Sequence, residues 1–531
     1  APEGWTVLSN QPETSSEPAQ AGVLHHFAET PMLSTYITAI MAGPYHGVTS
    51  EWTSADGSLT VPLGLWCRAS RAETMDADRL FEITRAGLDW YHENFGYPYP
   101  WGKYDQVFVP EYNLGAMENP GCVTFTEDYL FRSAATRAQY AGRSNTLQHE
   151  MAHMWFGDLV TPRWWDELWL KESFADFMGS WVNAHAAGFP EAWVTMAGRR
   201  LQWALEQDEL PTAHPVSADI PDVEAAKQNF DGITYAKGGA ALKQLVHHVG
   251  PDAFFAGSRQ YFVDHAFGNT TFADLVSALE GSSGRDLSGW THAWLETTGP
   301  DQLTGILEVD EQGRIIRAGV QQQSIDSSTG QPAQRPHTLS VGLYDVIEGR
   351  LELRDRIRVD MAGEGAALDL AGQPAPALML VDDENWTYAR IGLDPISLRT
   401  ALERISSLAE PLTRAILWGQ LWGMVRDARM PVIDYVHAVE MHASGETDAS
   451  TLTTILAHAR QAIEHYVPTS ARARARERHA AALDRMLAQA APGSDAQLII
   501  ARAAATQGSV TCASEPLLRA LLSDPLEGLQ V

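Results

Sequence analysis

The chain has 531 residues, 45% of them hydrophobic, and its 67 acidic residues outnumber the 38 basic ones to give a net charge of −29. This length exceeds that of a usual domain severalfold, so we expect about three domains with substantial cores. The acidic balance argues against nucleic acid binding through a basic surface and against adhesion to anionic lipid.

The chain begins with strand-like runs such as 35–40, which lie before Pro44. The following region is at first β-rich, as in the run 63–67, and turns mainly helical after Asn145. This pattern continues to about Gly299. We therefore separate 1–44 from a second unit at 45–299.

The most informative motif of that unit is a pair of histidines with a glutamate between them. The run from Ser144 opens with residues that cap helices, and no Pro or Gly follows before Gly157, which predicts a helix. In a helix, His149 and His153 lie one turn apart on one face, so both imidazoles can reach one metal ion. Glu150 lies about 100° round the helix and can reach only a water on that metal.

A third ligand, Glu172, lies in a later stretch, 165–177, that also lacks Pro and Gly. Two histidines and one glutamate, with the fourth position left to water, form the open coordination of a catalytic zinc. The alternative is a chance match on a solvated helix, which the placement of Glu172 makes the poorer explanation. Asp176, one turn beyond Glu172, either buttresses a ligand or is a solvated or capping residue.

Residues 300–393 alternate in the manner of strands, with Leu339, Val341 and Leu343 on one face. Turns with glycine at 311–313 and 348–350 separate these strands, so we expect a small β-sandwich. From Asp394 to 531 the pattern is helical, with an apolar stripe at helical spacing between Leu452 and Ile463. The alternate arginines in 472–478 are interpreted as a solvated helix surface rather than an anion site.

The best apolar run, 415–425, is shorter than the ~20 residues that a membrane-spanning helix needs, which predicts a buried helix and no membrane insertion. The three cysteines, Cys67, Cys122 and Cys512, are scattered and match no metal-site pattern. An odd, irregular count is typical of a reducing compartment, so we expect a cytoplasmic location. Secretion stays open as an alternative, because the sequence starts at Ala1 without an initiator Met.

Three blocks in order resemble the gluzincin zinc aminopeptidases of the aminopeptidase N type, most of all actinobacterial members. They are Gly115-Ala116-Met117-Glu118-Asn119, then the histidine motif with Glu172, then Tyr235-Ala236-Lys237-Gly238. The resemblance implies an α+β multidomain fold. Its parts are the remnant of an N-terminal β-domain at 1–44, a thermolysin-like zinc catalytic domain at 45–299, a β-sandwich domain at 300–393 and an α-helical C-terminal domain at 394–531. It also implies that most of the N-terminal domain and part of the C-terminal domain are missing.

Glu118 is the candidate for binding the free α-ammonium of a peptide, because a buried charge is costly without a partner. The resemblance implies that main-chain groups of Gly115 and Ala116 hold the substrate extended, in a motif completed by Met117 and Asn119. It also implies a second contact to the ammonium from the N-terminal domain, most of which this sequence lacks. Without the zinc motif, an ordinary loop with a solvated glutamate explains the motif better.

Tyr235 is implied by the resemblance to stabilise the oxyanion that forms when water attacks the peptide carbonyl. Its own surroundings in the sequence fit a packing tyrosine equally well. Leu114 and Phe230 line the pocket for the first side chain by the same resemblance. Both are apolar, which favours Ala, Leu, Met or the alkyl stems of Lys and Arg.

We therefore predict a zinc-dependent aminopeptidase with one Zn²⁺ per chain, in which Glu150 is the general base. It would act as a monomer on peptides with a free N-terminus. The alternatives are a zinc endopeptidase, which has no use for Glu118, and a non-catalytic peptide-binding fragment, which would have lost Glu150 or a ligand. Ser173 and Asp158 stand where the family commonly has Gly and Asn, and both changes leave the chemistry intact.

Overall fold

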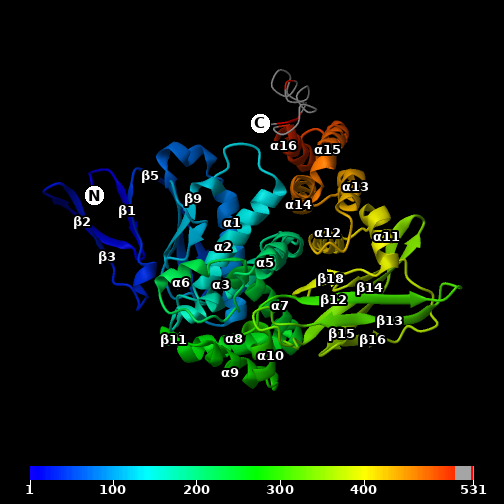
Figure 1. Ribbon diagram of the computed structural model, residues 1–531. Coiled ribbons are helices and arrows are strands. Elements are labelled where there is room, and N and C mark those ends of the chain that lie inside the picture. The colour runs from blue at the N-terminus through cyan, green and yellow to red at the C-terminus, as the bar shows by residue number, and fades with distance from the viewer. Residues whose placement is uncertain (509–518, 520–527, 530–531) are drawn as a thin grey trace.

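The computed structural model describes residues 1–508, 519 and 528–529, so Cys512 lies outside the described residues. Along the chain, the ribbon passes from small β-ribbons through a mixed region to a pair of sheets and a group of helices (Figure 1). Within the described part of the chain, no helix is long and apolar enough to cross a membrane.

The first residues form two antiparallel ribbons, in which β1 (Thr6–Ser9) pairs with β4 (Ile40–Gly43) and β2 (Glu13–Ala19) with β3 (Gly22–Phe27). The prediction of a strand at 35–40 is wrong for most of that run, because Thr35–Ile37 is a 3₁₀ turn, η1. The side chain of Asn10 replaces a strand partner here, donating to the carbonyl of Ile37 and accepting from the N–H of Ala39, both at 2.9 Å.

A five-stranded mixed sheet follows, and the strand expected at 63–67 is confirmed within it. Its order is β5 (Tyr45–Thr53), β6 (Thr60–Arg68), β7 (Tyr104–Val109), β9 (Cys122–Thr126), β8 (Ala116–Met117). The short edge strand β8 pairs antiparallel with β9, which fixes the 115–119 motif at one side of the sheet. The amphipathic helix α1 (Ala77–Phe95) buries Leu80, Leu88 and Tyr91 in the core shared with this sheet.

Two long helices, α2 (Arg137–His153) and α3 (Leu168–His185), lie at the centre of the molecule (Figure 1). The prediction that the first of them opens at Ser144 is wrong. It begins two turns earlier, where Thr136 and Gln139 form a capping box. Ser144 is instead fully buried inside the helix and donates to Asn183 Oδ1 at 2.6 Å, so its hydroxyl joins α2 to α3. The helix expected over 165–177 is confirmed from Leu168 on, after a 3₁₀ turn, η4 (Trp165–Glu167).

The rest of this region is helical and packs round α2 and α3. Its helices are α4 (Ala192–Thr195), α5 (Leu201–Asp208), α6 (Val223–Gln228), α7 (Gly238–Val249), α8 (Pro251–His265), α9 (Phe272–Ser283) and α10 (Ser288–Leu295). Two π-helical turns, η5 (Met196–Arg200) and η6 (Ile233–Lys237), interrupt it, and the short strands β10 (Val160–Pro162) and β11 (Gly268–Thr270) pair in parallel. Two 3₁₀ turns, η2 (Ala69–Thr74) and η3 (Glu127–Tyr129), lie earlier in the chain.

Residues Asp301 to Gly392 form two packed sheets. One has the order β16 (Gly365–Leu368), β13 (Ile315–Gln323), β12 (Asp301–Val309), β18 (Ala389–Gly392), and the other β15 (Arg350–Met361), β14 (His337–Ile347), β17 (Leu378–Val381). Leu339, Val341 and Leu343 lie in the shared core, as predicted. Ser340, which lies between them, is buried as well, and so is Thr338, whose backbone hydrogen-bonds the side chain of Gln244 of α7. The expected turns contain Gly313 and Gly349 at φ of 73° and 83°.

The helices that follow are α11 (Pro395–Arg404), α12 (Pro411–Arg426), α13 (Val432–His442), α14 (Ala449–Gln461), α15 (Thr469–Gln489) and α16 (Asp495–Gly508), with short turns η7 (Ile405–Ser407), η8 (Ala443–Gly445) and η9 (Ala462–Tyr466). The apolar run 415–425 is the buried helix α12, as predicted. The arginine run forms a surface, where Arg476 pairs with Glu464 and Arg478 with Glu440.

Candidate functional site

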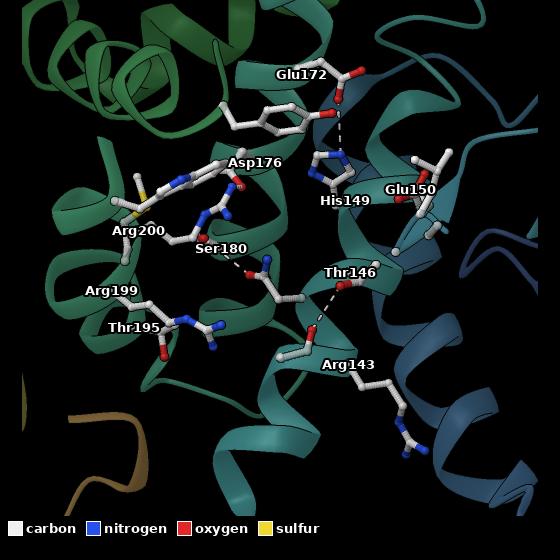
Figure 2. A pocket seen from close by; sticks show the side chains of 18 of the residues that line it. Arg143, Thr146, His149, Glu150, Glu172, Asp176, Ser180, Thr195, Arg199 and Arg200 are labelled. Carbon is white, nitrogen blue, oxygen red and sulfur yellow. Dashed lines mark hydrogen bonds and ion pairs between the residues drawn. The ribbon is translucent and has the colours of Figure 1, made fainter. Parts of the chain in front are cut away.

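The candidate metal ligands come from the facing surfaces of α2 and α3. Gly179 allows these helices to approach closely, because a Cβ at this position would lie 3.0 Å from the carbonyl oxygen of Asn145. His153 Nε2 lies 3.1 Å from His149 Nε2. Glu172 Oε2 lies 3.6 Å and 3.5 Å from those two nitrogens. Figure 2 shows His149 and Glu172 directed toward each other from the two helices.

The histidines and the glutamate hold the protonation states that a metal requires. His153 Nδ1 lies 2.9 Å from the carbonyl of Phe156, which only accepts, so Nδ1 carries a proton and Nε2 is the nitrogen that faces the cluster. Burial lowers the pKa of His149 and so favours its neutral form. Burial alone would raise the pKa of Glu172, but Lys171 and the two histidines lower it well below its usual range.

The donor set matches a catalytic zinc site rather than a structural one. One ligand-type atom from each of His149, His153 and Glu172 lies within 4.8 Å of the others. Two imidazoles and a carboxylate are the ligands of the open zinc sites that keep a position for water. These three residues therefore fit a single zinc ion.

Glu150 is buried on the neighbouring face of α2 and, with Glu118 and His153, forms a second group of donor atoms within 4.8 Å of one another. Burial, together with the charges of Glu118 and Glu172, raises its pKa well above the ordinary value. A raised pKa makes this carboxylate a better proton acceptor than a solvent-exposed glutamate, as suits an acid–base residue.

Glu118 is buried and already carries two partners that the sequence did not indicate. It forms an ion pair with Lys171 Nζ, and the hydroxyl of Tyr36 donates to its Oε1 at 3.1 Å. Lys171 Nζ also lies 3.0 Å from Glu172 Oε1, so one ammonium bridges the two glutamates. Burial would raise the pKa of Glu118, but Lys171 lowers it, so this carboxylate is ionised.

The sequence does contain one feature that could have indicated a role for Lys171. Lysine occurs only five times in the chain, and Lys171 stands directly before Glu172. Tyr36 had no comparable signal, because its run resembles a strand and gives no sign of a turn directed at Glu118.

The loop around Glu118 lines a large cavity, whose volume is about 1730 Å³. Gly115, Ala116 and Met117 face this cavity, together with Leu114 and Phe230, which are 52% and 46% exposed. Asn119 lies behind the loop instead, where its side-chain oxygen accepts a 3.2 Å hydrogen bond from Thr124. Its place in the motif is therefore to hold the loop against β9.

Tyr235 lies on the π-helical turn η6, with its ring 6.2 Å from that of His149. Burial and the charge of Glu172 raise its pKa well above the ordinary value, so the phenol keeps its proton. Asp231 caps this turn, because its Oδ1 accepts from the N–H groups of Ile233 and Thr234 at 2.9 Å and 3.0 Å. The turn continues directly into α7, which is buried along its first nine residues.

The two aspartates noted in the sequence are both buried. Asp176 pairs with Arg200, so it is neither solvated nor a cap, and it lines the cavity one turn from Glu172 (Figure 2). Neither carboxyl oxygen of Asp158 has a hydrogen-bond partner in the described part of the chain, and burial raises its pKa well above the ordinary value. The raised pKa favours the neutral acid, which is close in shape to the Asn that the family commonly has there.

Two family models match parts of the chain. Residues 79–294 match the peptidase family M1 domain, and residues 378–523 match the ERAP1-like C-terminal domain. The chain is 44% identical over 540 residues to an aminopeptidase N of Streptomyces lividans, an alignment that covers 100% of this chain and 62% of the relative. It is 29% identical over 447 residues to the tricorn protease-interacting factor F2 of Thermoplasma acidophilum, with 82% of this chain and 52% of the relative covered.

A third relative, an aminopeptidase N of Lactococcus lactis, is 34% identical over 308 residues, which cover 56% of this chain and 35% of the relative. The chain belongs to peptidase family M1 and is of the aminopeptidase N type. It spans 62% and 52% of the length of the Streptomyces and Thermoplasma relatives.

Proposed function

We propose that this chain is a zinc-dependent aminopeptidase that removes the N-terminal residue from peptides. The observation that supports the proposal is the pairing of Glu118, beside the ligand cluster, with the ammonium group of Lys171. A buried carboxylate that binds an ammonium ion so close to the ligands is suited to the α-ammonium of a peptide. The names of the relatives from Streptomyces and Lactococcus agree with this proposal.

In the proposed mechanism, His149, His153 and Glu172 hold one zinc ion, which when bound activates a water and polarises the scissile carbonyl. Glu150 accepts a proton from the attacking water and passes it to the leaving nitrogen, a transfer that its raised pKa supports. The hydroxyl of Tyr235 donates to the carbonyl oxygen as negative charge develops there.

Glu118 fixes the direction of the peptide in this proposal. Its carboxylate accepts hydrogen bonds from the α-ammonium. When substrate binds, this interaction replaces part of the ion pair between Glu118 and Lys171. Main-chain groups at Gly115 and Ala116 run alongside the substrate, and Leu114 and Phe230 border its first side chain. The units that carry these parts are proposed to be a small β unit at 1–44, a catalytic domain at 45–299, a β-sandwich at 300–393 and helices from 394 to 531.

The deciding experiment compares free and N-acetylated forms of the same leucyl peptide. The free peptide should be cleaved and the acetylated one spared, and Glu118→Ala should weaken binding of the free form by about 2–5 kcal/mol, as when one partner of a buried charge pair is removed. Equal cleavage of both forms would replace the proposal with an endopeptidase. No cleavage of either form by the zinc-loaded chain would leave a peptide-binding fragment.

A further inference from the structure

The cavity that begins at the ligand cluster extends far along α2 and α3. Glu172, Asp176 and Ser180 all line it from successive turns of α3. Glu172 and Ser180 are eight residues apart, and this spacing corresponds to about 12 Å along a helix. A cavity of that length can hold more of a peptide than a single amino acid residue.

The cavity is rich in arginine, although the protein as a whole is strongly acidic. Six arginines line it: Arg143, Arg163, Arg199, Arg200, Arg460 and Arg502. Two of their charges are balanced, because Arg143 pairs with Asp76 and Arg200 with Asp176. The other four have no ion pair in the described part of the chain, although carboxylates such as Asp128 also line the cavity, so the cavity contains positive charges without a direct partner.

Arg199 is the unbalanced arginine nearest in the chain to the Asp176–Arg200 pair. Within residues 1–508 it has no ion-pair or hydrogen-bond partner, and its side chain is exposed to the cavity. Figure 2 shows it reaching into the pocket beside Thr195, on the side away from Glu172. It leaves the helix from the π-helical turn η5, a distortion that is frequent at functional sites.

We infer that Arg199 binds a carboxylate on the leaving-group part of the peptide, and so selects short peptides with a free C-terminus. The inference rests on the proposed aminopeptidase function. Guanidinium groups bind carboxylates through two parallel hydrogen bonds, which lysine cannot reproduce. An extended peptide advances about 3.3 Å per residue, so a reach of about 12 Å corresponds to three or four residues beyond the scissile bond.

The chemistry has two possible sources, a C-terminal α-carboxylate and an acidic side chain. Wild-type kcat/KM would be measured for leucyl-alanine peptides of three to six residues, each as the free acid and as the C-terminal amide. A third arm replaces one alanine of the amide with glutamate. The α-carboxylate predicts that acids exceed amides by about tenfold, the scale of a charge-assisted hydrogen bond, with the largest ratio at four or five residues.

The matched variants are Arg199→Gln, Arg199→Lys and Arg474→Gln, the last removing an exposed charge on α15 outside the cavity. Arg199→Gln should bring the acid-to-amide ratio close to one, Arg199→Lys should restore part of it, and Arg474→Gln should keep it whole. Circular dichroism melts would show that each variant is folded.

The results separate the two proposals. If free-amine peptides are cleaved but acids and amides react equally in the wild type, the carboxylate site is wrong and the aminopeptidase stands. A ratio that survives Arg199→Gln would also overturn it. If glutamate in the amide restores the rate, the carboxylate site stands and its ligand is an acidic side chain. If no peptide is cleaved, both proposals fail.

Discussion

Ser173 Oγ donates a 2.6 Å hydrogen bond to the carbonyl of Thr234. Ser173 directly follows the candidate ligand Glu172, and Thr234 directly precedes Tyr235, so this bond connects the candidate ligand cluster to the turn that carries the tyrosine. Gly238 makes the contact possible, because a Cβ at that position would overlap the hydroxyl of Ser173. Ser173 stands where the family commonly has glycine, and the space for its hydroxyl is left by the absence of a side chain at Gly238.

Ser173→Ala should lower kcat by about tenfold while KM changes little, since Tyr235 would lose a support that matters most in the transition state. The loss of one buried hydrogen bond should also cost about 1 kcal/mol of unfolding free energy. The control is Ser258→Ala, which removes a fully buried hydroxyl bonded to Phe254 within α8. This control variant should show a similar decrease in the free energy of unfolding and an unchanged kcat. Equal kcat in both variants would show that the bond is structural only.

Tyr235→Phe removes one hydroxyl and should lower kcat by about 10²–10³, as for loss of a donor to a developing oxyanion. Steady-state kinetics on a leucyl amide would measure this. In the Tyr235→Phe background, Ser173→Ala should have little further effect, because its proposed action runs through the phenol. A fall confined to KM would instead make Tyr235 a substrate-binding residue.

Metal removal should separate a ligand from the base. Chelation should abolish hydrolysis and added zinc should restore it. Glu172→Ala should lose bound zinc, measured by atomic absorption, whereas Glu150→Ala should retain zinc and lose turnover. Equal zinc loss in both variants would mean that the two roles are assigned wrongly.

The turn that carries Tyr235 should depend on pH through His214. Its Nδ1 lies 2.8 Å from the carbonyl of Pro215 and its Nε2 3.1 Å from Asp231 Oδ2, and because both partners accept, the ring carries both protons. Burial would lower the pKa of His214, but Asp231 raises it above the ordinary 6.5.

A raised pKa means that this pair stabilises the fold fully below pH 6.5 and that the contribution is lost as pH rises through the folded value. Urea unfolding at pH 6, 7 and 8 should therefore show a larger decline for the wild type than for His214→Gln. His26→Gln, at an exposed pair with Glu17, should behave like the wild type. Parallel curves for wild type and His214→Gln would contradict the assignment.

The sequence predicted that the three candidate ligands lie together, because most of the information for this cluster is local. His149 and His153 lie one turn apart on the same face of their helix whatever its tertiary surroundings. The packing of α3 against that face is then enough to bring Glu172 beside them. The start of α2 was missed because Ser144 and Asn145 look like a cap, yet their side chains bond to α3. Such a pairing is tertiary and leaves no periodic signal.

The contacts of Lys171 and Tyr36 with Glu118 were beyond reach for the same reason. Each joins residues far apart in the chain, and the direction of a lysine side chain depends on which charges the fold places around it. The roles of Glu118 and Tyr235 came from the resemblance and stay predictions. The alternation of apolar and polar residues in β14 correctly predicted which side chains face the core between the two sheets. It could not predict the burial of Thr338, because that burial depends on the packing of α7 against the strand.

The π-helical turns η5 and η6 carry a consequence for how this site tolerates changes in chain length. A π turn holds one residue more than an α turn, so each is equivalent to a single-residue insertion in a helix. Deleting one residue within such a turn would restore α geometry, so the flanking helical segments would keep their relative orientation and the side chains of the turn itself would be redirected. Tyr235 and Arg199 lie in these turns, so their side chains would change direction relative to the cavity with every other side chain of the site still in place. A one-codon deletion here would be a loss-of-function change that no comparison of motif residues could detect.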